Sequence, residues 1–177
     1  MTTYRERQHK AAFLAAACIT AVTALFASTP SAAAREPLRY VKTPTGYLMV
    51  LRRGDDVIAS LEKLAATEKV PSASLTGIGF FSDVTFGFYD FDKKEFAPKT
   101  FRDVEVAGMT GSIGWKENKP SVHLHAVAAA RDFNAVGGHV LDAKVGTGSA
   151  EITLLVHDRQ LERKVDPEIG ANVLQLE

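Results

Sequence analysis

Residues 120–154 read PSVHLHAVAAARDFNAVGGHVLDAKVGTGSAEITL and contain three successive strand candidates. The candidates are Val122–Ala129, Ala135–Val145 and Ser149–Val156, and the turn Arg131–Asn134 lies between the first two. Short apolar segments that are separated by Asp, Asn and Gly are typical of antiparallel strands. This stretch therefore predicts the centre of a largely antiparallel sheet.

The sequence upstream adds one helix and further strands. An Asp at position 55 or 56 can cap a helix in which Val57, Leu61 and Leu64 recur at helical spacing, and the helix must end before Pro71. Five more strand candidates are Tyr47–Leu51, Ala73–Phe81, Asp83–Tyr89, Val104–Met109 and Gly111–Trp115. One helix and about eight short strands predict an α+β fold, a sandwich-like arrangement in which the helix covers a mostly antiparallel sheet.

Three histidines lie close together in the sequence of the central stretch. His123 and His125 are two residues apart, so on a strand they point to the same face. The register of the following hairpin decides whether His139 joins them. A three-residue loop, residues 131–133, places His139 opposite His125, whereas a two-residue loop places it opposite Leu124 on the other face. A bulge at the glycines before His139 could also correct the register.

Three imidazoles on one face are suited to zinc, which accepts nitrogen ligands and tolerates an open fourth position. The sequence thus makes His123, His125 and His139 candidate ligands of a metal ion, with zinc as the expected cofactor. The alternative is that these side chains hydrogen-bond within a polar pocket or an oligomer interface. Glu151 is a candidate fourth ligand or general base, and its alternative is an exposed carboxylate. His157 is expected at the surface.

The N-terminus resembles a secretory signal peptide over residues 1–34. Basic residues precede the apolar run Ala11–Ala27, a break follows at Pro30, and Ala32–Ala34 forms a cleavage site before Arg35. A retained membrane anchor is the alternative, although the apolar run is short for a bilayer span. Cys18 lies within this run and lacks the setting of a lipidated cysteine. We therefore predict an exported protein, periplasmic or secreted, with one domain over residues 35–177 and its core at about 47–156.

Charge and cysteine content exclude several classes of function. Removal of residues 1–34 leaves 18 of the 21 basic and 20 of the 21 acidic side chains, a net charge of about −2. A protein that binds DNA normally carries a basic surplus on one face, so nucleic acid is not an expected partner. Cys18 is the only cysteine, so the mature chain has no disulfide, thiol chemistry or cysteine–zinc site.

Several segments resemble the plant and prokaryote conserved (PPC) domain. They are YLMVLRRGDDVIASLEKL (residues 47–64), SLTGIGFFSDVTFGFYD (74–90), VEVAGMTGSIG (104–114) and residues 123–154. The resemblance implies a compact α/β domain, a homotrimer and, in prokaryotic members, a metal-binding cluster that corresponds to His123, His125 and His139. Plant members carry AT-hooks in nuclear proteins, but no basic Arg-Gly-Arg-Pro tract occurs here.

Three functions follow as hypotheses. The first is an exported trimeric module that binds a metal ion or a small-molecule ligand without catalysis. The second is a small zinc-dependent hydrolase or lyase in which Glu151 acts as the base. The third is DNA binding, as in the plant relatives, which the charge and the predicted export both oppose. After removal of the signal peptide, no membrane association is expected.

Overall fold

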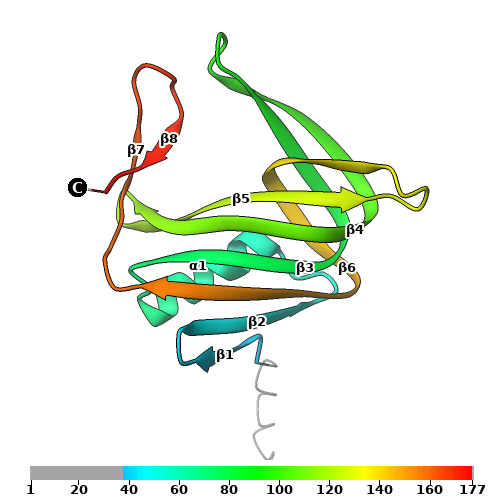
Figure 1. Ribbon diagram of the computed structural model, residues 1–177, viewed down its shortest axis with the longest axis horizontal. Coiled ribbons are helices and arrows are strands. Elements are labelled where there is room, and N and C mark those ends of the chain that lie inside the picture. Colours follow the sequence, from blue (N-terminus) through cyan, green and yellow to red (C-terminus); the bar gives the residue numbers. More distant parts are fainter. Residues whose placement is uncertain (1–37, 177) are drawn as a thin grey trace, which may run out of the picture. The chain divides into compact units, whose positions relative to one another are not determined.

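The computed structural model describes residues 38–176, which form one helix and eight strands (Figure 1). The helix is α1 (Val57–Glu68), and the strands are β1 (Tyr40–Thr43), β2 (Gly46–Arg52), β3 (Ser72–Asp90), β4 (Glu95–Lys116), β5 (Lys119–Ala129), β6 (Ala135–His157), β7 (Arg163–Val165) and β8 (Asn172–Leu174). The predicted signal peptide and Cys18 lie outside the described residues. No helix within residues 38–176 combines the length and the apolar character that a membrane span requires.

The predicted helix is confirmed, including its cap. Asp56 is the N-cap, and its side chain accepts a hydrogen bond from the Ala59 amide at 2.8 Å. Asp55 has a different role, because its carboxylate accepts from the Arg52 amide and pairs with Arg39. Lys69 ends the helix in the left-handed conformation, with φ at 54°. Both ends of α1 are therefore fixed by local hydrogen bonds, as the sequence indicates.

The eight strand candidates merge into five longer strands, and β1, β7 and β8 were not predicted. Residues 73–81 and 83–89 belong to one strand, β3, and the later pairs of candidates likewise merge into β4 and β6. The backbone register shifts within β3 between Gly77 and Gly79 and again between Phe81 and Asp83. These irregularities are β-bulges, which bend a strand without ending it. The prediction of separate strands was wrong because the polar and glycine residues mark bends rather than turns.

Six strands form the main sheet, in the order β1-β2-β6-β3-β4-β5, and every neighbouring pair is antiparallel. β6 also pairs with β5, so that β3, β4, β5 and β6 form a closed cycle of pairings. Figure 1 shows how this is possible: β6 begins in yellow beside β5, bends, and ends in orange beside β2. The expected α+β class therefore holds only roughly, because a partly closed antiparallel sheet dominates the fold.

The core lies between α1 and the inner face of the sheet. Val57, Leu61 and Leu64 of α1 are buried, and they belong to the same cluster as Phe81 and Ile152 of the sheet. Alternate residues of the strands supply the other buried side chains, as the period of a strand requires. Burial of this apolar surface is the main force that holds the helix against β5 and β6.

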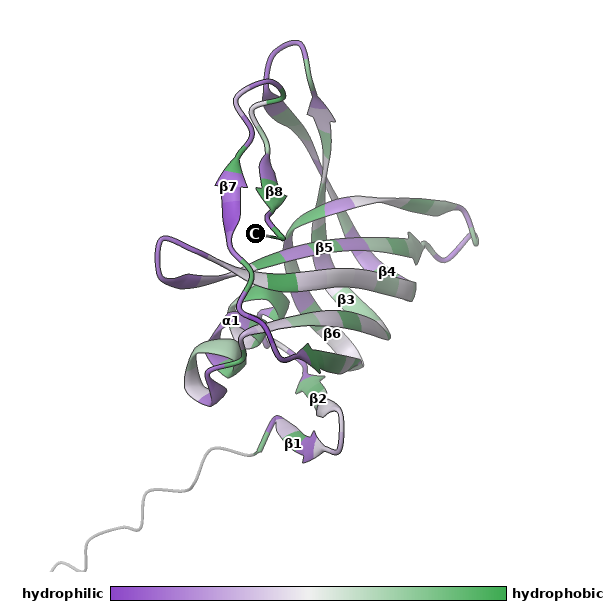
Figure 2. Ribbon diagram, turned by 60° about the vertical axis from the view of Figure 1, so that its left-hand side comes forward, coloured by the Kyte–Doolittle hydropathy of each residue, from purple (hydrophilic) through white to green (hydrophobic). Residues whose placement is uncertain are grey.

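The short strands β7 and β8 form a separate two-stranded arm after β6. The Tyr89 hydroxyl donates to the carbonyl oxygen of Ile169 at 3.2 Å, and Lys94 Nζ donates to that of Pro167 at 3.0 Å. These bonds connect the β7–β8 arm to the tip of the β3–β4 hairpin, and Figure 2 shows the two elements rising on the same side of the sheet. A pocket lined by residues of both elements contains the candidate functional site.

Candidate metal centre

The β5–β6 hairpin has the register that brings the three histidines together. His125 pairs directly with His139, and the pairing continues without a shift to Ala129 and Ala135. In the turn, the Phe133 amide donates to the Ala130 carbonyl oxygen at 2.9 Å, and Phe133 has a positive φ of 64°. The register predicted for the three-residue loop is therefore confirmed, and no bulge in the hairpin is needed.

His123 and His125 lie on the face of β5 that is turned away from the core, and His139 lies beside them on β6. Leu124 and Ala126 are buried, so His123 and His125 point to the opposite face of the strand. One ligand nitrogen from each of His123, His125 and His139 lies within 4.8 Å of the other two. His123 Nε2 and His125 Nε2 are 3.2 Å apart. The hairpin thus converts a local sequence pattern into a cluster of three nitrogen donors.

The donor set fits a tetrahedral ion such as zinc. With zinc–nitrogen distances of about 2.0–2.1 Å, two tetrahedral ligands lie roughly 3.3 Å apart. The separation of 3.2 Å between His123 Nε2 and His125 Nε2 agrees with this value. The same contact can be a hydrogen bond between two imidazoles in the metal-free protein. Three protein ligands leave a fourth position for water or another ligand.

Burial and nearby positive charges favour the neutral form of His123 and His139. Burial, assisted by His123, His125 and Arg163, lowers the pKa of His139 to about 4. Burial also lowers the pKa of His123, followed by the charges of Arg163 and His125. A metal-bound imidazole must be neutral, so both side chains are in the form that a metal ion requires.

Phe96 of β4 supports His139 from outside the cluster. The two rings stack with their centroids 4.7 Å apart and their planes at 26°. Gly87 of β3, which pairs with His139, leaves the space for this ring: a Cβ at position 87 would lie 2.7 Å from Phe96 Cδ1. The stacking restricts the orientation of the imidazole, as the surroundings of metal ligands commonly do.

Arg163 of β7 brings a positive charge to the same place. Its side chain is only 6% exposed, and Nη2 donates to Ser112 Oγ at 2.7 Å. Ser112 pairs with His123 across β4 and β5, so the hydrogen bond holds the guanidinium next to the cluster. Sequence reasoning missed both Arg163 and Phe96. Nothing in the sequence distinguishes Arg163 from its charged neighbour Lys164.

A pocket of about 770 Å³ contains the cluster. Its lining includes the three histidines and Arg163, aromatic residues of the β3–β4 tip, and residues 169–173 of the β7–β8 arm. This volume is within the range typical of small-molecule sites. The pocket can therefore hold a small ligand beside the imidazoles.

Comparison with protein families identifies the fold. Residues 38–157, more than half of the chain, match the family described as the Plants and Prokaryotes Conserved (PCC) domain. The chain belongs to this family. The match contains α1, both long hairpins and all three histidines of the PCC domain, whereas Arg163 and the β7–β8 arm follow it. A comparison with curated proteins finds no match.

Solved structures of similar proteins agree with this assignment. A protein from Ralstonia eutropha JMP134, named as a candidate DNA-binding protein, is 60% identical, with a TM-score of 0.77 over 78% of this chain and 96% of that one. A metal-containing protein from Archaeoglobus fulgidus is 26% identical, with a TM-score of 0.66 over 72% and 91%. A plant- and prokaryote-conserved protein from Pyrococcus horikoshii is 21% identical, with a TM-score of 0.67 over 78% and 96%, and shares the fold.

The structure does not bring Glu151 to the histidines of this PCC domain. Glu151 is exposed and pairs with Ile78 of β3, whereas His139 pairs with Gly87, nine residues further along the same strand. Its alternation with the buried Ile152 is as predicted. Within one chain, Glu151 is therefore not positioned as a fourth ligand or as a base at the cluster.

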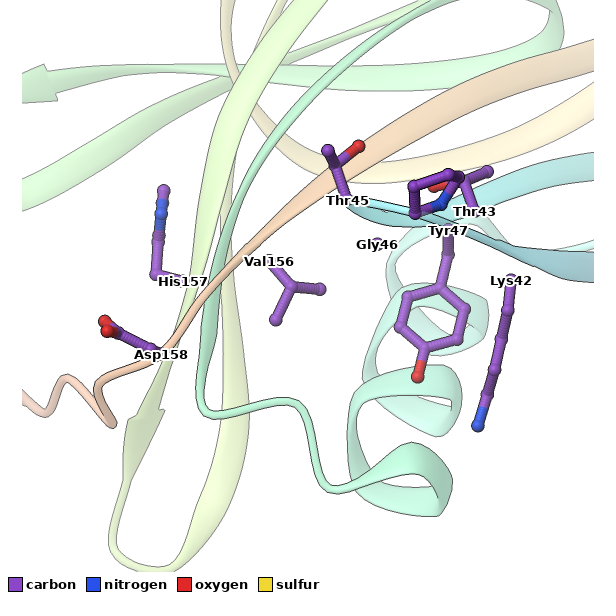
Figure 3. Close-up of a pocket in the computed structure, with 9 residues that line it drawn as sticks. Lys42, Thr43, Thr45, Gly46, Tyr47, Val156, His157 and Asp158 are labelled. Atoms are coloured by element: carbon purple, nitrogen blue, oxygen red, sulfur yellow. The ribbon is translucent and has the colours of Figure 1, made fainter.

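His157 also lies away from the cluster. It is at the end of β6, where its Nε2 is 3.1 Å from Ser74 Oγ. It lines a different, open pocket with residues of the β1–β2 hairpin such as Lys42 and Thr45 (Figure 3). His157 is partly exposed. It lies on the same strand as His139 but does not belong to the candidate metal centre.

We expect the metal-free protein to lose stability as the pH is lowered from about 6.5 to about 4. The folded protein holds the pKa of His139 at about 4, whereas an unperturbed imidazole titrates near 6.5. Between these values the unfolded chain binds a proton that the folded chain does not, so protonation favours unfolding. Urea titrations of metal-stripped protein at several pH values measure the effect. His139→Asn should show a smaller fall than the wild type, and an equal fall would contradict the assignment.

Proposed function

We propose that this protein is a metal-binding module of the PCC family, in which His123, His125 and His139 hold one zinc ion. The observation that carries the proposal is the convergence of three imidazole nitrogens within 4.8 Å of one another. The lowered pKa of His139 supports it, because a neutral imidazole is the form that binds metal. The metal-containing relative from Archaeoglobus fulgidus adds support at the level of the family.

Zinc is the ion that the donor set favours. All three donors are imidazole nitrogens, and harder cations such as Mg²⁺ and Ca²⁺ prefer oxygen ligands. Three ligands and one open position are also common to zinc sites that exchange a water or a small ligand. The pocket beside the cluster supports the same view, because it provides room for such a ligand.

A binding module is favoured over an enzyme that uses Glu151 as its base. The hydrolase or lyase hypothesis depends on a carboxylate close to the open position of the metal. Glu151 pairs with Ile78 rather than with a residue near the histidines. Among residues 38–176, the charges that influence His123 and His139 come from imidazoles and Arg163 and not from a carboxylate. The enzyme hypothesis thus lacks its base within one chain.

DNA binding is a weaker candidate, although the relative from Ralstonia eutropha is named for it. Without residues 1–34 the chain has a net charge of about −2, which opposes binding to a phosphate backbone. Export would also separate the protein from the chromosome. We therefore propose that nucleic acid is not a partner of this chain.

Metal analysis of the purified protein tests the main proposal. Protein that is purified without chelators should retain close to one zinc ion per chain after dialysis, measured by plasma mass spectrometry. Removal with a chelator followed by addition of zinc should restore the same content. Protein that holds no zinc, and takes up none when zinc is added, would contradict the proposal.

We propose that the mature protein is exported and begins at or near Arg35. The evidence is the basic, apolar and small-residue order of residues 1–34, which is the order of a signal peptide. N-terminal sequencing of protein from its native host should therefore start at or near Arg35. An N-terminus at Met1 or Thr2 would contradict export and remove the argument from compartment.

We also propose that the mature chain is a homotrimer, as resemblance to the family implies. The chain has no cysteine after residue 34, so a disulfide cannot stabilise it and an oligomer interface would contribute instead. Light scattering at micromolar concentration should give about three times the mass of one mature chain. A monomeric mass at this concentration would show that this member does not assemble in that way.

A further inference from the structure

We propose that the pocket beside the histidines binds a small organic carboxylate, whose negative group pairs with the guanidinium of Arg163. The proposal rests in part on the proposed function, because the carboxylate would lie next to the metal. The observation that carries it is independent of the metal: Arg163 is buried, and its charge has no counter-ion within residues 38–176.

Arg163 is buried and incompletely bonded. Its Nη2 donates to the neutral hydroxyl of Ser112, whereas Nε is fully buried and has no hydrogen-bond partner among the described residues. An arginine remains protonated under ordinary conditions, so its charge persists in the pocket. A buried charge without a partner is costly, and natural proteins rarely keep one unless a ligand or another chain completes it.

The surroundings of Arg163 favour an anion. The charge of Arg163 acts on His123 and His139, and no carboxylate among residues 38–176 is a resolved influence on these two histidines. A zinc ion at the cluster would add further positive charge. A negatively charged group in the pocket would therefore meet two complementary partners, and a guanidinium can hold a carboxylate through two parallel hydrogen bonds.

The walls of the pocket favour a ligand with an apolar body. Phe88, Phe91 and Phe96 line the pocket, and Phe88 and Phe91 are largely exposed in the free chain. The aromatic rings pack against one another: the centroid of the Tyr89 ring lies 5.0 Å from that of Phe91 and 4.9 Å from that of Phe96. A phosphate group alone would gain nothing from these side chains, whereas an aromatic or alkyl carboxylate would cover them.

The position of Arg163 relative to the cluster sets the orientation of the ligand. Ser112, which holds the guanidinium, pairs with His123, and the aromatic wall contacts the cluster at His139 through the stack with Phe96. A carboxylate at Arg163 is thus adjacent to the imidazoles, while its apolar body extends toward the β3–β4 tip.

Benzoate and its neutral analogue benzamide provide the test. Their affinities for the purified protein can be measured by calorimetry or ligand-observed NMR, both for zinc-loaded and for metal-stripped protein. Benzoate should bind at least about tenfold more tightly than benzamide, because only benzoate can form an ion pair. Equal affinities, or no detectable binding of benzoate, would overturn the proposal. Inorganic phosphate that binds more tightly than benzoate would overturn the assignment of a carboxylate.

Variants locate the binding. Arg163→Met should weaken benzoate binding at least about tenfold and leave benzamide binding unchanged. Arg159→Met, which alters an exposed arginine four residues earlier in the sequence, should leave the binding of both compounds unchanged. Benzoate affinity that survives Arg163→Met would overturn the proposal. Circular dichroism checks that each variant folds. If Arg163→Met does not fold, the comparison of benzoate with benzamide on the wild type still decides.

The two proposals can fail separately. If the protein holds no zinc but binds benzoate through Arg163, the metal proposal fails and the carboxylate site stands. If the protein holds zinc but does not distinguish benzoate from benzamide, the carboxylate site fails and the metal proposal stands.

Discussion

His139→Ala should remove most of the metal from the purified protein. The two remaining candidate ligands, His123 and His125, lie on one strand, and two nitrogens cannot form a closed tetrahedral site with the fold's own donors. Replacement of a residue that only supports a ligand costs about 10–100-fold in affinity, so loss of a ligand should cost at least about 100-fold. Plasma mass spectrometry after dialysis, and competition with a coloured chelator, measure the content and the affinity.

Two matched variants serve as controls for this result. His157→Ala removes another histidine of β6, and Glu151→Gln removes the carboxylate that the sequence suggested as a ligand. Both side chains lie away from the cluster, so both variants should retain the metal content of the wild type. A loss in Glu151→Gln would show that Glu151 reaches the metal through another chain. Retention in His139→Ala would contradict the proposed site.

Gly111→Ala should destabilise the protein by about 3 kcal/mol, near the upper end of the usual cost of overpacking. Gly111 of β4 pairs with Leu124 of β5, and a Cβ at position 111 would lie 2.1 Å from the carbonyl oxygen of His123. Because backbone atoms form this contact, a change of rotamer cannot relieve it, and the strands must separate. Urea titration measures the stability, and the displacement of His123 should also weaken metal binding.

Gly108→Ala is the control for this substitution. Gly108 is on the same strand, three residues earlier, but a Cβ there would meet no atom within 4 Å. The described structure therefore has space for the methyl group, and its effect should remain within about 1 kcal/mol. Equal destabilisation by the two variants would show that the loss of glycine, rather than the contact with His123, is responsible.

The features that could be predicted from the sequence are those that depend on neighbouring residues. The cap at Asp56 and the apolar face of α1 follow from positions within one or two turns. The pairing of His125 with His139 follows from the length of one turn. Each of these depends on local geometry, which propensity and periodicity describe well. The hairpin register and the convergence of the three histidines were therefore predicted correctly, and their binding of a metal stays a prediction.

The features that could not be predicted depend on contacts between distant residues. The continuity of β3 through Gly77 and Ser82 depends on partners in β4 and β6 that no local pattern shows. Arg163 becomes part of the site only because the β7–β8 arm folds back to Ser112, 51 residues earlier in the chain. Glu151 shares a strand with His139 but lies twelve residues further along it, and an extended strand rises about 3.3 Å per residue. In strands of this length, residues that are near one another in the sequence can lie far apart in space.

The closed cycle of strands also has a consequence for the folding pathway. β6 closes the cycle by pairing with β3, and this joins residues as far apart as Ser72 and His157, whereas His123 and His139 are only 16 residues apart. Closing a short loop costs less chain entropy than closing a long one, so the hairpin with the histidines can form before the sheet closes. An ion bound at that stage would stabilise the transition state as well as the native sheet, so it would accelerate folding and have little effect on the rate of unfolding.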